Sequence, residues 1–292
     1  MIQQAINGIF LGSIYALFAL GYTLVFGVLD ILNLAHQAVF MLCAFTALAL
    51  MSALHLHTLV ALPIAVVSSG FIGILLERAA FRPLRGRADS NISGLISSLA
   101  MATIFESIAL EVWGPDVSRF PFGSVPERQL HLGGAVVSEV QLVIIGISVV
   151  MMIGLTVLLQ RTRLGRHIRA VAESPLAARV LGVDVDRVIA ASFFISSALG
   201  GAAGVLFGLA FNSISADVGR SVELKGLAVI IVGGMGSMPG AVIAGFGLGL
   251  VEVFTVAKLG SSYRDAVSFG VLFLVLLLRP RGLLGQAATR VA

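Results

Sequence analysis

Charged residues and cysteine are both scarce in this sequence of 292 residues. Only 12% of the residues are charged and 58% are hydrophobic, whereas about a quarter of a typical soluble domain is charged. This scarcity excludes an ordinary soluble protein. The lone Cys43 lies in an apolar run and has no second cysteine with which to form a disulfide in the chain, so we expect it to serve packing.

The sequence contains several long apolar runs. A run of roughly 20 apolar residues spans a hydrocarbon core of about 30 Å as a helix, and unbroken runs exclude a barrel. We therefore expect an all-α, polytopic membrane protein that forms one domain over residues 1–292, with about eight transmembrane segments. The expected helices are 7–28, 37–54, 58–76, 91–112, 140–160, 188–211, 225–257 with a break, and 263–279.

The run 225–257 is interrupted at its centre by residues that end helices. The interrupting residues are Gly233, Gly234, Gly236, Pro239 and Gly240. The pattern predicts two short crossings or a re-entrant pair, with a first half of about ten residues. Elsewhere Gly200, Gly204 and Gly208 recur at every fourth position, which predicts a smooth groove for close helix packing.

Basic residues are absent before Arg78, so the amino terminus lacks the positive region of a signal peptide and is expected to remain as a helix. The Lys and Arg residues that follow cluster in three segments, 78–87, 161–187 and 279–290. The positive-inside rule places all three in the cytoplasm. It makes 161–187 a cytoplasmic loop and 113–139 an external loop, and it predicts a cytoplasmic carboxyl terminus.

The external loop is rich in proline and aromatic residues, so it serves either as a contact surface or as a cover over helix ends. The net charge of +4 does not indicate nucleic-acid binding, because the basic residues form no stripe with interleaved aromatics.

The cytoplasmic loop contains a helix with recognisable ends. Ser174 followed by Pro175 is a helix-start signal and Gly182 is a stop signal. The enclosed helix 175–181 presents Leu176, Val180 and Leu181, with Arg179 beside them. Either another protein covers this short apolar face, or the helix rests on the membrane surface.

Two groups of polar residues interrupt the apolar runs. Asn33 and His36 lie between the first two helices, where they either cap the helix ends or line a passage. Glu106 lies inside a helix with Ser98 and Thr103 nearby, and a carboxyl group there should face the bundle interior, as a lining or gating group or in a structural hydrogen bond. Glu252 lies closer to the end of its run and is expected to be hydrated more easily.

Enzymatic motifs are missing. The glycine-rich break carries no Gly-Lys-Ser/Thr ending of a phosphate-binding loop, and the sequence has no Gly-x-Ser-x-Gly or His-Glu-x-x-His motif. His36 has no accompanying ligand cluster for a metal. We expect no enzyme activity, no metal and no cofactor in this chain.

Four segments resemble the permeases of branched-chain amino acid ABC importers, of the LivH type. The resemblance covers nearly the whole chain and is carried by 21–36, 162–187, 232–241 and 279–285. It differs at Gln37, where the family usually has glycine, and this difference leaves the substrate open. Permeases of the same type serve urea, amides, other neutral amino acids or aromatic acids.

The resemblance implies a complex in the bacterial inner membrane. Its other members would be two cytoplasmic ATPase subunits that hold ATP and Mg, a second permease that is a paralogue or a copy, a periplasmic binding protein and membrane lipid. A gradient-driven carrier or channel is the alternative, and it would require coupling-ion sites near the midplane.

The resemblance also assigns the coupling residues, whereas the path residues are mainly the polar groups described above. The ATPase-coupling residues are Arg166, Arg169, Glu173, Ser174, Pro175, Leu176, Arg179, Val180, Leu181 and Gly182. The expected translocation-path residues are Asn33, His36, Gln37, Ser98, Thr103 and Glu106.

Overall fold

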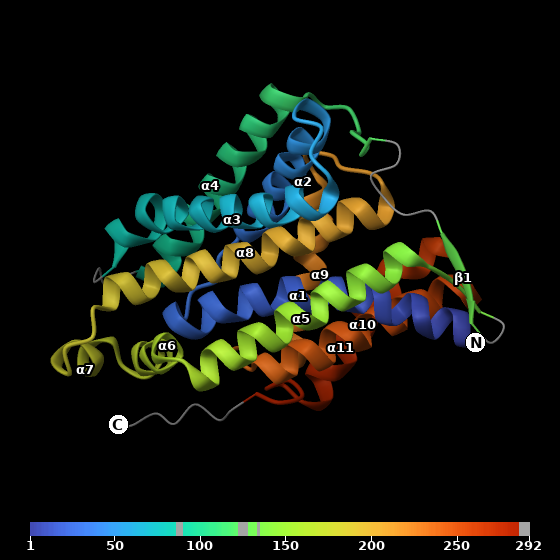
Figure 1. Ribbon diagram of the computed structural model, residues 1–292. Helices are drawn as coiled ribbons and strands as arrows, with labels where there is room; N and C mark the ends of the chain where they lie inside the picture. The colour runs from blue at the N-terminus through green and yellow to red at the C-terminus, as the bar shows by residue number, and fades with distance from the viewer. Residues whose placement is uncertain (86–89, 122–127, 133–134, 286–292) are drawn as a thin grey trace.

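The computed structural model describes residues 1–85, 90–121, 128–132 and 135–285, and this part of the chain is almost entirely helical (Figure 1). The helices are α1 (Ile2–Leu29), α2 (His36–Ala53), α3 (Thr58–Leu76), π-helix η1 (Glu77–Phe81), 3-10 helix η2 (Arg82–Leu84), α4 (Ser90–Trp113), α5 (Glu139–Arg161), α6 (Arg163–Glu173), α7 (Pro175–Val180), α8 (Val185–Phe211), α9 (Val218–Gly233), α10 (Met238–Leu259), 3-10 helix η3 (Ser261–Tyr263) and α11 (Arg264–Leu278). Strands β1 (Gln129–Leu132) and β2 (Ala135–Ser138) form an antiparallel hairpin.

Among the described residues, eight helical segments are long and apolar enough to cross a membrane. They are α1, α2, α3 with its extension to Leu84, α4, α5, α8, α10 and η3 with α11. Their number confirms the prediction of a polytopic helical membrane protein.

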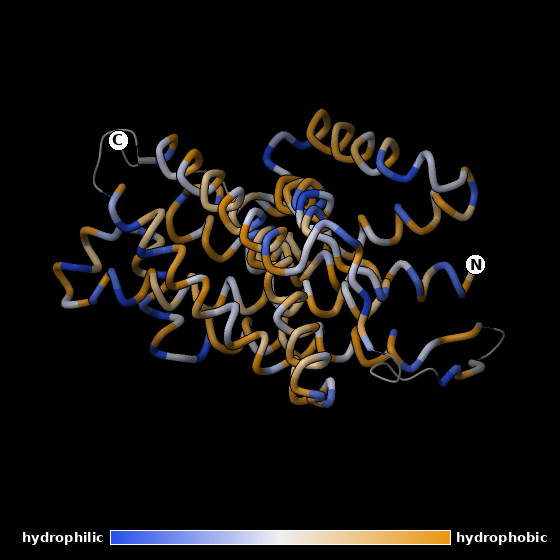
Figure 2. Tube along the Cα trace, turned by 90° about the horizontal axis from the view of Figure 1, so that it is seen from above, coloured by the Kyte–Doolittle hydropathy of each residue, from blue (hydrophilic) through white to orange (hydrophobic). Residues whose placement is uncertain are grey.

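The core is built around α1, which packs against α8 and α10. Of its apolar segment 89% is buried, against 6% for the segment that contains α11. The contact with α10 is close because glycines face backbone there: a Cβ at Gly12 would lie 2.7 Å from Cα of Phe246. The outer helices also carry many hydrophobic residues (Figure 2), as expected for a bundle whose outside faces lipid.

Gly200, Gly204 and Gly208 of α8 make close contacts, as predicted, and so does the neighbouring Gly201. Gly201 accommodates Cys43 of α2, whose sulfur would lie 2.8 Å from an added Cβ, and a side chain at Gly204 would overlap the carbonyl oxygen of Phe40. Cys43 is fully buried, so its packing role is confirmed. Gly208 receives Phe120, an aromatic residue of the loop that follows α4.

The interrupted run was predicted wrongly at its amino-terminal end. The first half is the 16-residue α9, which begins at Val218 rather than at residue 225. Hydropathy missed the first turns because they carry charged residues that find partners inside the protein. The break itself was predicted correctly: α9 ends at Gly233, and Gly234 and Gly236 have φ of 101° and 82°.

The start of α10 uses the remaining break residues. Ser237 caps the helix by accepting a hydrogen bond from the Gly240 amide at 3.3 Å, and Pro239 occupies the first turn. The segment after α11 closes over this break, since the Leu283 amide donates to the Val232 carbonyl oxygen at 2.7 Å.

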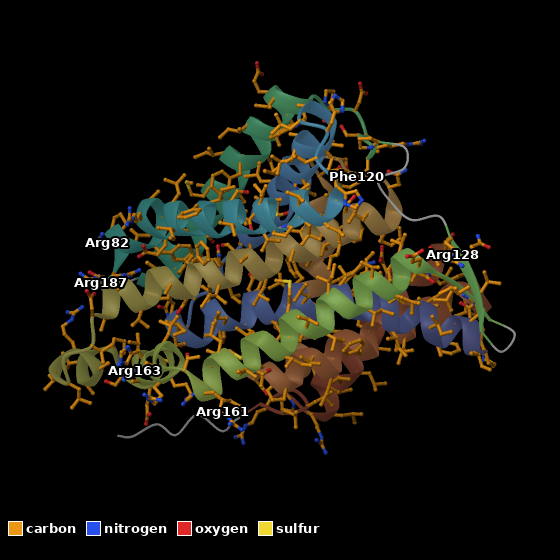
Figure 3. All side chains as sticks on the ribbon, in the orientation of Figure 1. Arg82, Phe120, Arg128, Arg161, Arg163 and Arg187 are labelled. Carbon is orange, nitrogen blue, oxygen red and sulfur yellow. The ribbon has the colours of Figure 1, made fainter. Side chains whose placement is uncertain are left out.

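Two ends of the molecule are distinct. Gln3 bonds the backbone of Val136 in the β hairpin, so the amino terminus and the hairpin share one end. The helices α6 and α7 lie at the other end (Figure 1). Arg161, Arg163, Arg187 and Arg82 lie toward the α6–α7 end, whereas Phe120 and Arg128 lie away from it (Figure 3).

The loop 113–139 contains more structure than the sequence indicated. Besides the hairpin, Ser118 forms a β-bridge with Ile214, and the Phe120 amide donates to Asn212 Oδ1 at 2.9 Å. These contacts place residues 118–120 over the end of α8, which favours the interpretation of a cover. Residues 122–127 and 133–134 of this loop lie outside the described part.

Candidate functional site

The helix α7 projects from the end of the bundle on a rigid base formed by α6. Thr162 caps α6 by accepting a hydrogen bond from the Gly165 amide at 3.1 Å, and Ile168 and Val171 are buried against the bundle. Arg169 donates to the Leu159 carbonyl oxygen at the end of α5. A side chain at Gly165 would overlap that same carbonyl, so the turn between α5 and α6 requires glycine.

The boundaries of α7 agree with the predicted start and stop. Ser174 Oγ accepts from the Ala177 amide at 3.2 Å, Pro175 is the first helical residue, and Gly182 has φ of 83°. The helix ends at Val180, so Leu181 is its C-cap rather than its last residue. Arg166, Glu173 and Arg179 are exposed around it.

The predicted apolar face of α7 is uncovered in this chain. Leu176 is 74% exposed, and Val180 and Leu181 are each 81% exposed. Only Ala178 of this helix is buried. A helix so short has little stability alone, so the cap, the proline and the base on α6 hold the face in place.

Ion pairs connect the neighbourhood of α7 to α3 and α8. Arg85, just after η2, pairs with Glu77 and donates to Asp186 Oδ1 of α8 at 2.8 Å. Burial lowers the pKa of the Arg85 guanidinium, and the Asp186 carboxylate opposes that shift. The sequence analysis used Arg82 and Arg85 only to orient the chain in the membrane and did not predict these ion pairs. Glu77 and Asp186, each beside a helix end, were the available signal.

A second polar group lies between α2, α4 and α9. Glu106 of α4 is 7% exposed and receives two hydrogen bonds from Arg220 of α9, from Nη2 to Oε2 at 2.5 Å and from Nε to Oε1 at 3.2 Å. Gln37 of α2 donates to the same Oε1 at 3.2 Å. The structure thus joins two predicted path residues and adds Arg220, which the sequence analysis missed because it placed residue 220 outside any helix.

Asn33 and His36 occupy the break between α1 and α2. Asn33 Oδ1 accepts from the Ala35 amide at 3.2 Å, and Ser98 Oγ of α4 accepts from the Leu34 amide at 3.1 Å. These bonds satisfy backbone at the break, as the capping interpretation required. His36 is fully buried, with its ring centroid 4.8 Å from that of Phe18, and does not open onto a passage in this conformation.

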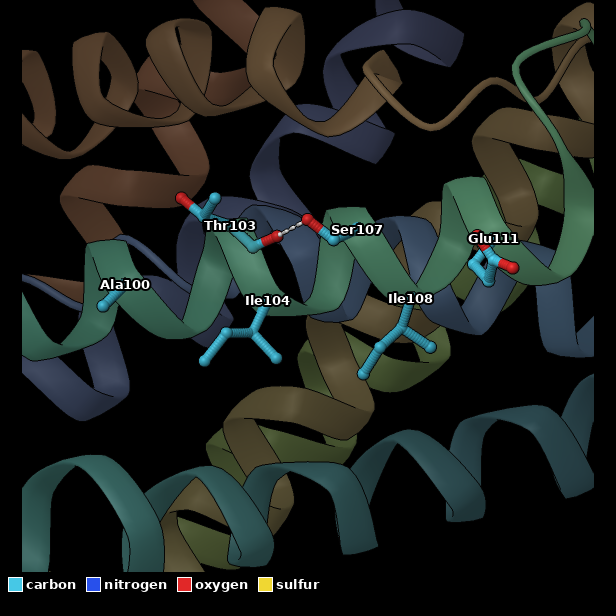
Figure 4. Close-up of a pocket in the computed structure, with 6 residues that line it drawn as sticks. All are labelled: Ala100, Thr103, Ile104, Ser107, Ile108 and Glu111. Carbon is cyan, nitrogen blue, oxygen red and sulfur yellow. Dashed lines mark hydrogen bonds between the residues drawn. The ribbon is translucent and has the colours of Figure 1, made fainter.

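Thr103 lies apart from this group. It lines a shallow groove of about 580 Å³ along α4, together with Ala100, Ile104, Ser107, Ile108 and Glu111 (Figure 4). Its hydroxyl donates to the Leu99 carbonyl oxygen, within its own helix. The structure therefore does not join Thr103 to Glu106.

Glu252 contradicts the expectation of easy hydration, because it is fully buried. Lys225 Nζ of α9 donates to its Oε1 at 2.8 Å, and Arg264 pairs with the same oxygen. Lys225 also lies 3.3 Å from the Tyr15 hydroxyl of α1. Lys225 of α9 therefore connects this helix to α1 and α10, and Arg264 of α11 shares the Glu252 carboxylate.

No group of three or more His, Cys, Asp or Glu side chains with metal-binding geometry occurs among the described residues. The fold instead brings together ion-paired side chains, such as Glu106 with Arg220, and the hydrogen-bonded amide of Gln37. Side chains of these kinds can bind and orient a polar solute.

Comparison with known proteins places these features in a family. Residues 4–276 match the family described as "Branched-chain amino acid transport system / permease component". The chain is 35% identical to the high-affinity branched-chain amino acid transport system permease protein BraD of Pseudomonas aeruginosa, covering 98% of this chain and 96% of that protein. The permease protein LivH of Escherichia coli is also 35% identical, with the same coverage.

A more distant relative is the probable branched-chain amino acid transport permease protein LivH of Methanocaldococcus jannaschii, which is 27% identical over 96% of this chain. The match covers six of the candidate membrane helices completely and most of the first and the last. The chain therefore belongs to the branched-chain amino acid transport permease family and is a permease component of a transport system.

Proposed function

We propose that this chain is the membrane subunit of an ATP-driven importer for branched-chain or other small neutral amino acids. The complex contains two separate ATPase subunits, one of which binds the exposed face of α7, and a periplasmic binding protein delivers the substrate. A second permease, a paralogue or a copy, completes the membrane part. The complex lies in the bacterial inner membrane, with the carboxyl terminus in the cytoplasm.

The observation that carries the proposal is the uncovered face of Leu176, Val180 and Leu181 on a capped, supported helix. Amphipathic helices of this kind bind in apolar grooves of partner proteins. The family match makes this chain the permease component of a transport system. Its sequence contains no phosphate-binding loop, so we assign ATP hydrolysis to a partner subunit.

A movement of α7 can be transmitted directly to the membrane-spanning helices. A turn at Gly182 separates α7 from α8, and Asp186 at the start of α8 is tied to Arg85 beyond α3. When the ATPases close on ATP, displacement of α7 would tilt α8 and α3 together. Such a step favours one of two access states, because nucleotide binds the closed ATPase arrangement more tightly.

Leu181→Asp tests the proposal. A carboxylate placed in an apolar groove loses its hydration without gaining a partner, so we expect substrate-stimulated ATP hydrolysis in proteoliposomes with the binding protein to be abolished. Membrane insertion of the chain should be unchanged, because position 181 is exposed.

The matched control is Leu54→Asp. Leu54 is 62% exposed and lies at the turn after α2, away from α6 and α7. Stimulated hydrolysis should survive this change. Normal stimulation in the Leu181→Asp variant would refute the docking role of α7.

A further inference from the structure

A cavity of about 290 Å³ lies between α7 and the membrane-spanning bundle. Its wall is formed by the end of α1, by η1 and η2, by α4, by α7 and by the start of α8. Most of the lining is apolar and includes Ile31, Phe81 and Ile189. The charged lining residues are Arg85, Arg179 and Asp186. Apolar walls beside two guanidinium groups are suited to an amphiphilic anion.

The cavity lies at the level where membrane-spanning helices end. The span of α1 ends at Leu29 and the extended span of α3 ends at Leu84, and both residues line the cavity. The span of α8 begins at Val185, which also lines it, and the span of α4 begins three residues before the lining Gly94. Because apolar spans end where hydrocarbon gives way to lipid headgroups, the membrane itself supplies phosphate groups at this level.

Positive charge at the cavity is not fully balanced. Arg82 and Arg85 form a connected set of ion pairs with the carboxylates of Glu77 and Asp186. Arg179 adds a third guanidinium, and its side chain has no ion pair or hydrogen bond within the described residues. In this part of the chain, three guanidinium groups therefore accompany two carboxylates, which leaves one positive charge for an external anion.

Arg85 also keeps hydrogen-bond donors in reserve. A guanidinium has five N–H groups. Arg85 Nη1 donates to Asp186 and Nη2 to Glu77, and its Nε has no acceptor among the residues that the structure describes. Its side chain remains 21% exposed, so the two ion pairs do not seal it from the cavity that it lines. Guanidinium groups match the geometry of phosphate oxygens.

We propose that this cavity binds the phosphate group of an anionic phospholipid. The phosphate oxygens accept hydrogen bonds from Arg179 and from the remaining donors of Arg85, and the adjoining carbons of the lipid cover Ile31 and Phe81. The volume is close to that of the smallest ligand pockets, so most of the lipid stays in the bilayer. The orientation in the proposed function places this lipid in the cytoplasmic leaflet, but binding itself does not depend on that orientation.

The bound lipid also fastens α7 to the bundle, because Arg179 and Pro175 belong to α7 whereas the rest of the lining belongs to the bundle. Free inorganic phosphate has no carbon to cover the apolar walls. A zwitterionic phospholipid brings an additional positive group beside Arg85 and Arg179, which repel it. An anionic phospholipid satisfies both the walls and the charge.

Lipid titration followed by native mass spectrometry tests the site. The intact complex of this chain with its partner permease and ATPases is stripped of lipid in detergent. It is then titrated with dioleoyl phosphatidylglycerol or with dioleoyl phosphatidylcholine, which has the same acyl chains. We expect one phosphatidylglycerol per copy of this chain to bind about tenfold more tightly than phosphatidylcholine. An excess of inorganic phosphate should not displace it.

Two variants locate the site. Arg179→Gln removes the unpaired charge and should lower the affinity for phosphatidylglycerol about tenfold, to that for phosphatidylcholine. Gly94→Leu fills part of the cavity and should weaken binding of both lipids. Arg163→Gln is the matched control, because Arg163 is an exposed arginine of the same loop that does not line the cavity. It should bind both lipids as the wild type does, and the same spectra verify that each variant assembles.

Hydrogen exchange tests whether the lipid fastens α7. This chain and its partner permease are placed in nanodiscs of either lipid without the ATPases, which would cover α7. The amides of residues 176–182 should exchange more slowly in phosphatidylglycerol than in phosphatidylcholine, because a held helix opens less often. The difference should vanish in Arg179→Gln and persist in Arg163→Gln.

Equal affinities for the two lipids, displacement by inorganic phosphate, or equal affinities in Arg179→Gln and Arg163→Gln overturn the lipid site. Exchange of α7 that is the same in both lipids overturns its fastening. Neither measurement involves ATP hydrolysis or uptake. Failure of the lipid site therefore leaves the proposed function standing, whereas absence of substrate-stimulated ATP hydrolysis in the wild-type complex contradicts the proposed function and leaves the lipid site untouched.

Discussion

At the scale of single residues, glycines pack directly against polar side chains in the interior of this protein. A hydropathy profile does not distinguish these positions from the rest of an apolar run. Gly200 is an example. A Cβ there would lie 2.5 Å from the Nε2 of His36, and the His36 ring is held between Phe18 and Tyr22. The glycine is therefore required by the histidine as well as by helix packing.

Gly200→Ala should destabilise the protein by about 1–3 kcal/mol, as overpacking of a filled core does. The thermal midpoint in detergent measures the effect. Gly146→Ala on α5, where an added Cβ meets nothing within 4 Å, should leave the midpoint unchanged or slightly raised. Combining Gly200→Ala with His36→Ala should restore part of the loss. A drop of equal size in both glycine variants would disprove the packing role of Gly200.

The pair of Lys225 and Glu252 is the other residue-scale test. Their side chains are 11% and 1% exposed, and Arg264 pairs with the same Glu252 oxygen. A buried charge left without any partner costs about 3–5 kcal/mol. Lys225→Met keeps Arg264 beside Glu252, so it should lower the thermal midpoint less than the double variant Lys225→Met with Arg264→Met, which leaves the Glu252 carboxylate unpaired. If the double variant is as stable as Lys225→Met, these ion pairs do not stabilise the bundle in the way described.

At the scale of elements, the sequence predicted the helices wherever composition alone decides the structure. The spans α1 to α5 and α8 follow from unbroken apolar runs, and α7 follows from Ser174, Pro175 and Gly182. The start of α9 did not follow, because Arg220 and Glu223 look like a solvated loop until the ion pair of Arg220 with Glu106 of α4 is known. Their helical spacing was the only signal.

The cap of α7 gives a test at this scale. Ser174→Ala removes the acceptor of the Ala177 amide, which costs a helix about 0.5–2 kcal/mol. We expect substrate-stimulated ATP hydrolysis to fall severalfold without being abolished. Ser174→Asp should retain most of the activity, since aspartate caps as well as serine. Equal loss in both variants would mean that the hydroxyl has a role other than capping.

At the scale of the whole molecule, the helices form a lipid-facing bundle with different structures at its two ends. The hairpin and residues 118–120 cover one end, and α6 and α7 project from the other (Figure 1). Composition predicted the bundle, and basic clusters predicted that 78–87 and 161–187 share an end, which the pairing of Arg85 with Asp186 bears out.

The candidate site was predicted only in part. Glu106 was identified because a carboxyl group stands out in an apolar run, and Gln37 because it replaces the glycine usual in the family that the chain resembles. The two side chains do meet. Thr103 was expected beside Glu106 from its place on the same helix, but it points into the groove on the exposed side of α4 (Figure 4). Contacts between distant helices depend on tilt and break geometry, which a hydropathy pattern does not contain.

The central claim is that an ATPase subunit binds the face of α7. A photo-crosslinking amino acid placed at position 181 tests it most directly, in intact complexes, with position 54 as the control. We predict a crosslink to the ATPase subunit from position 181 and none from position 54. No crosslink from position 181, or equal crosslinking from both positions, would contradict the account.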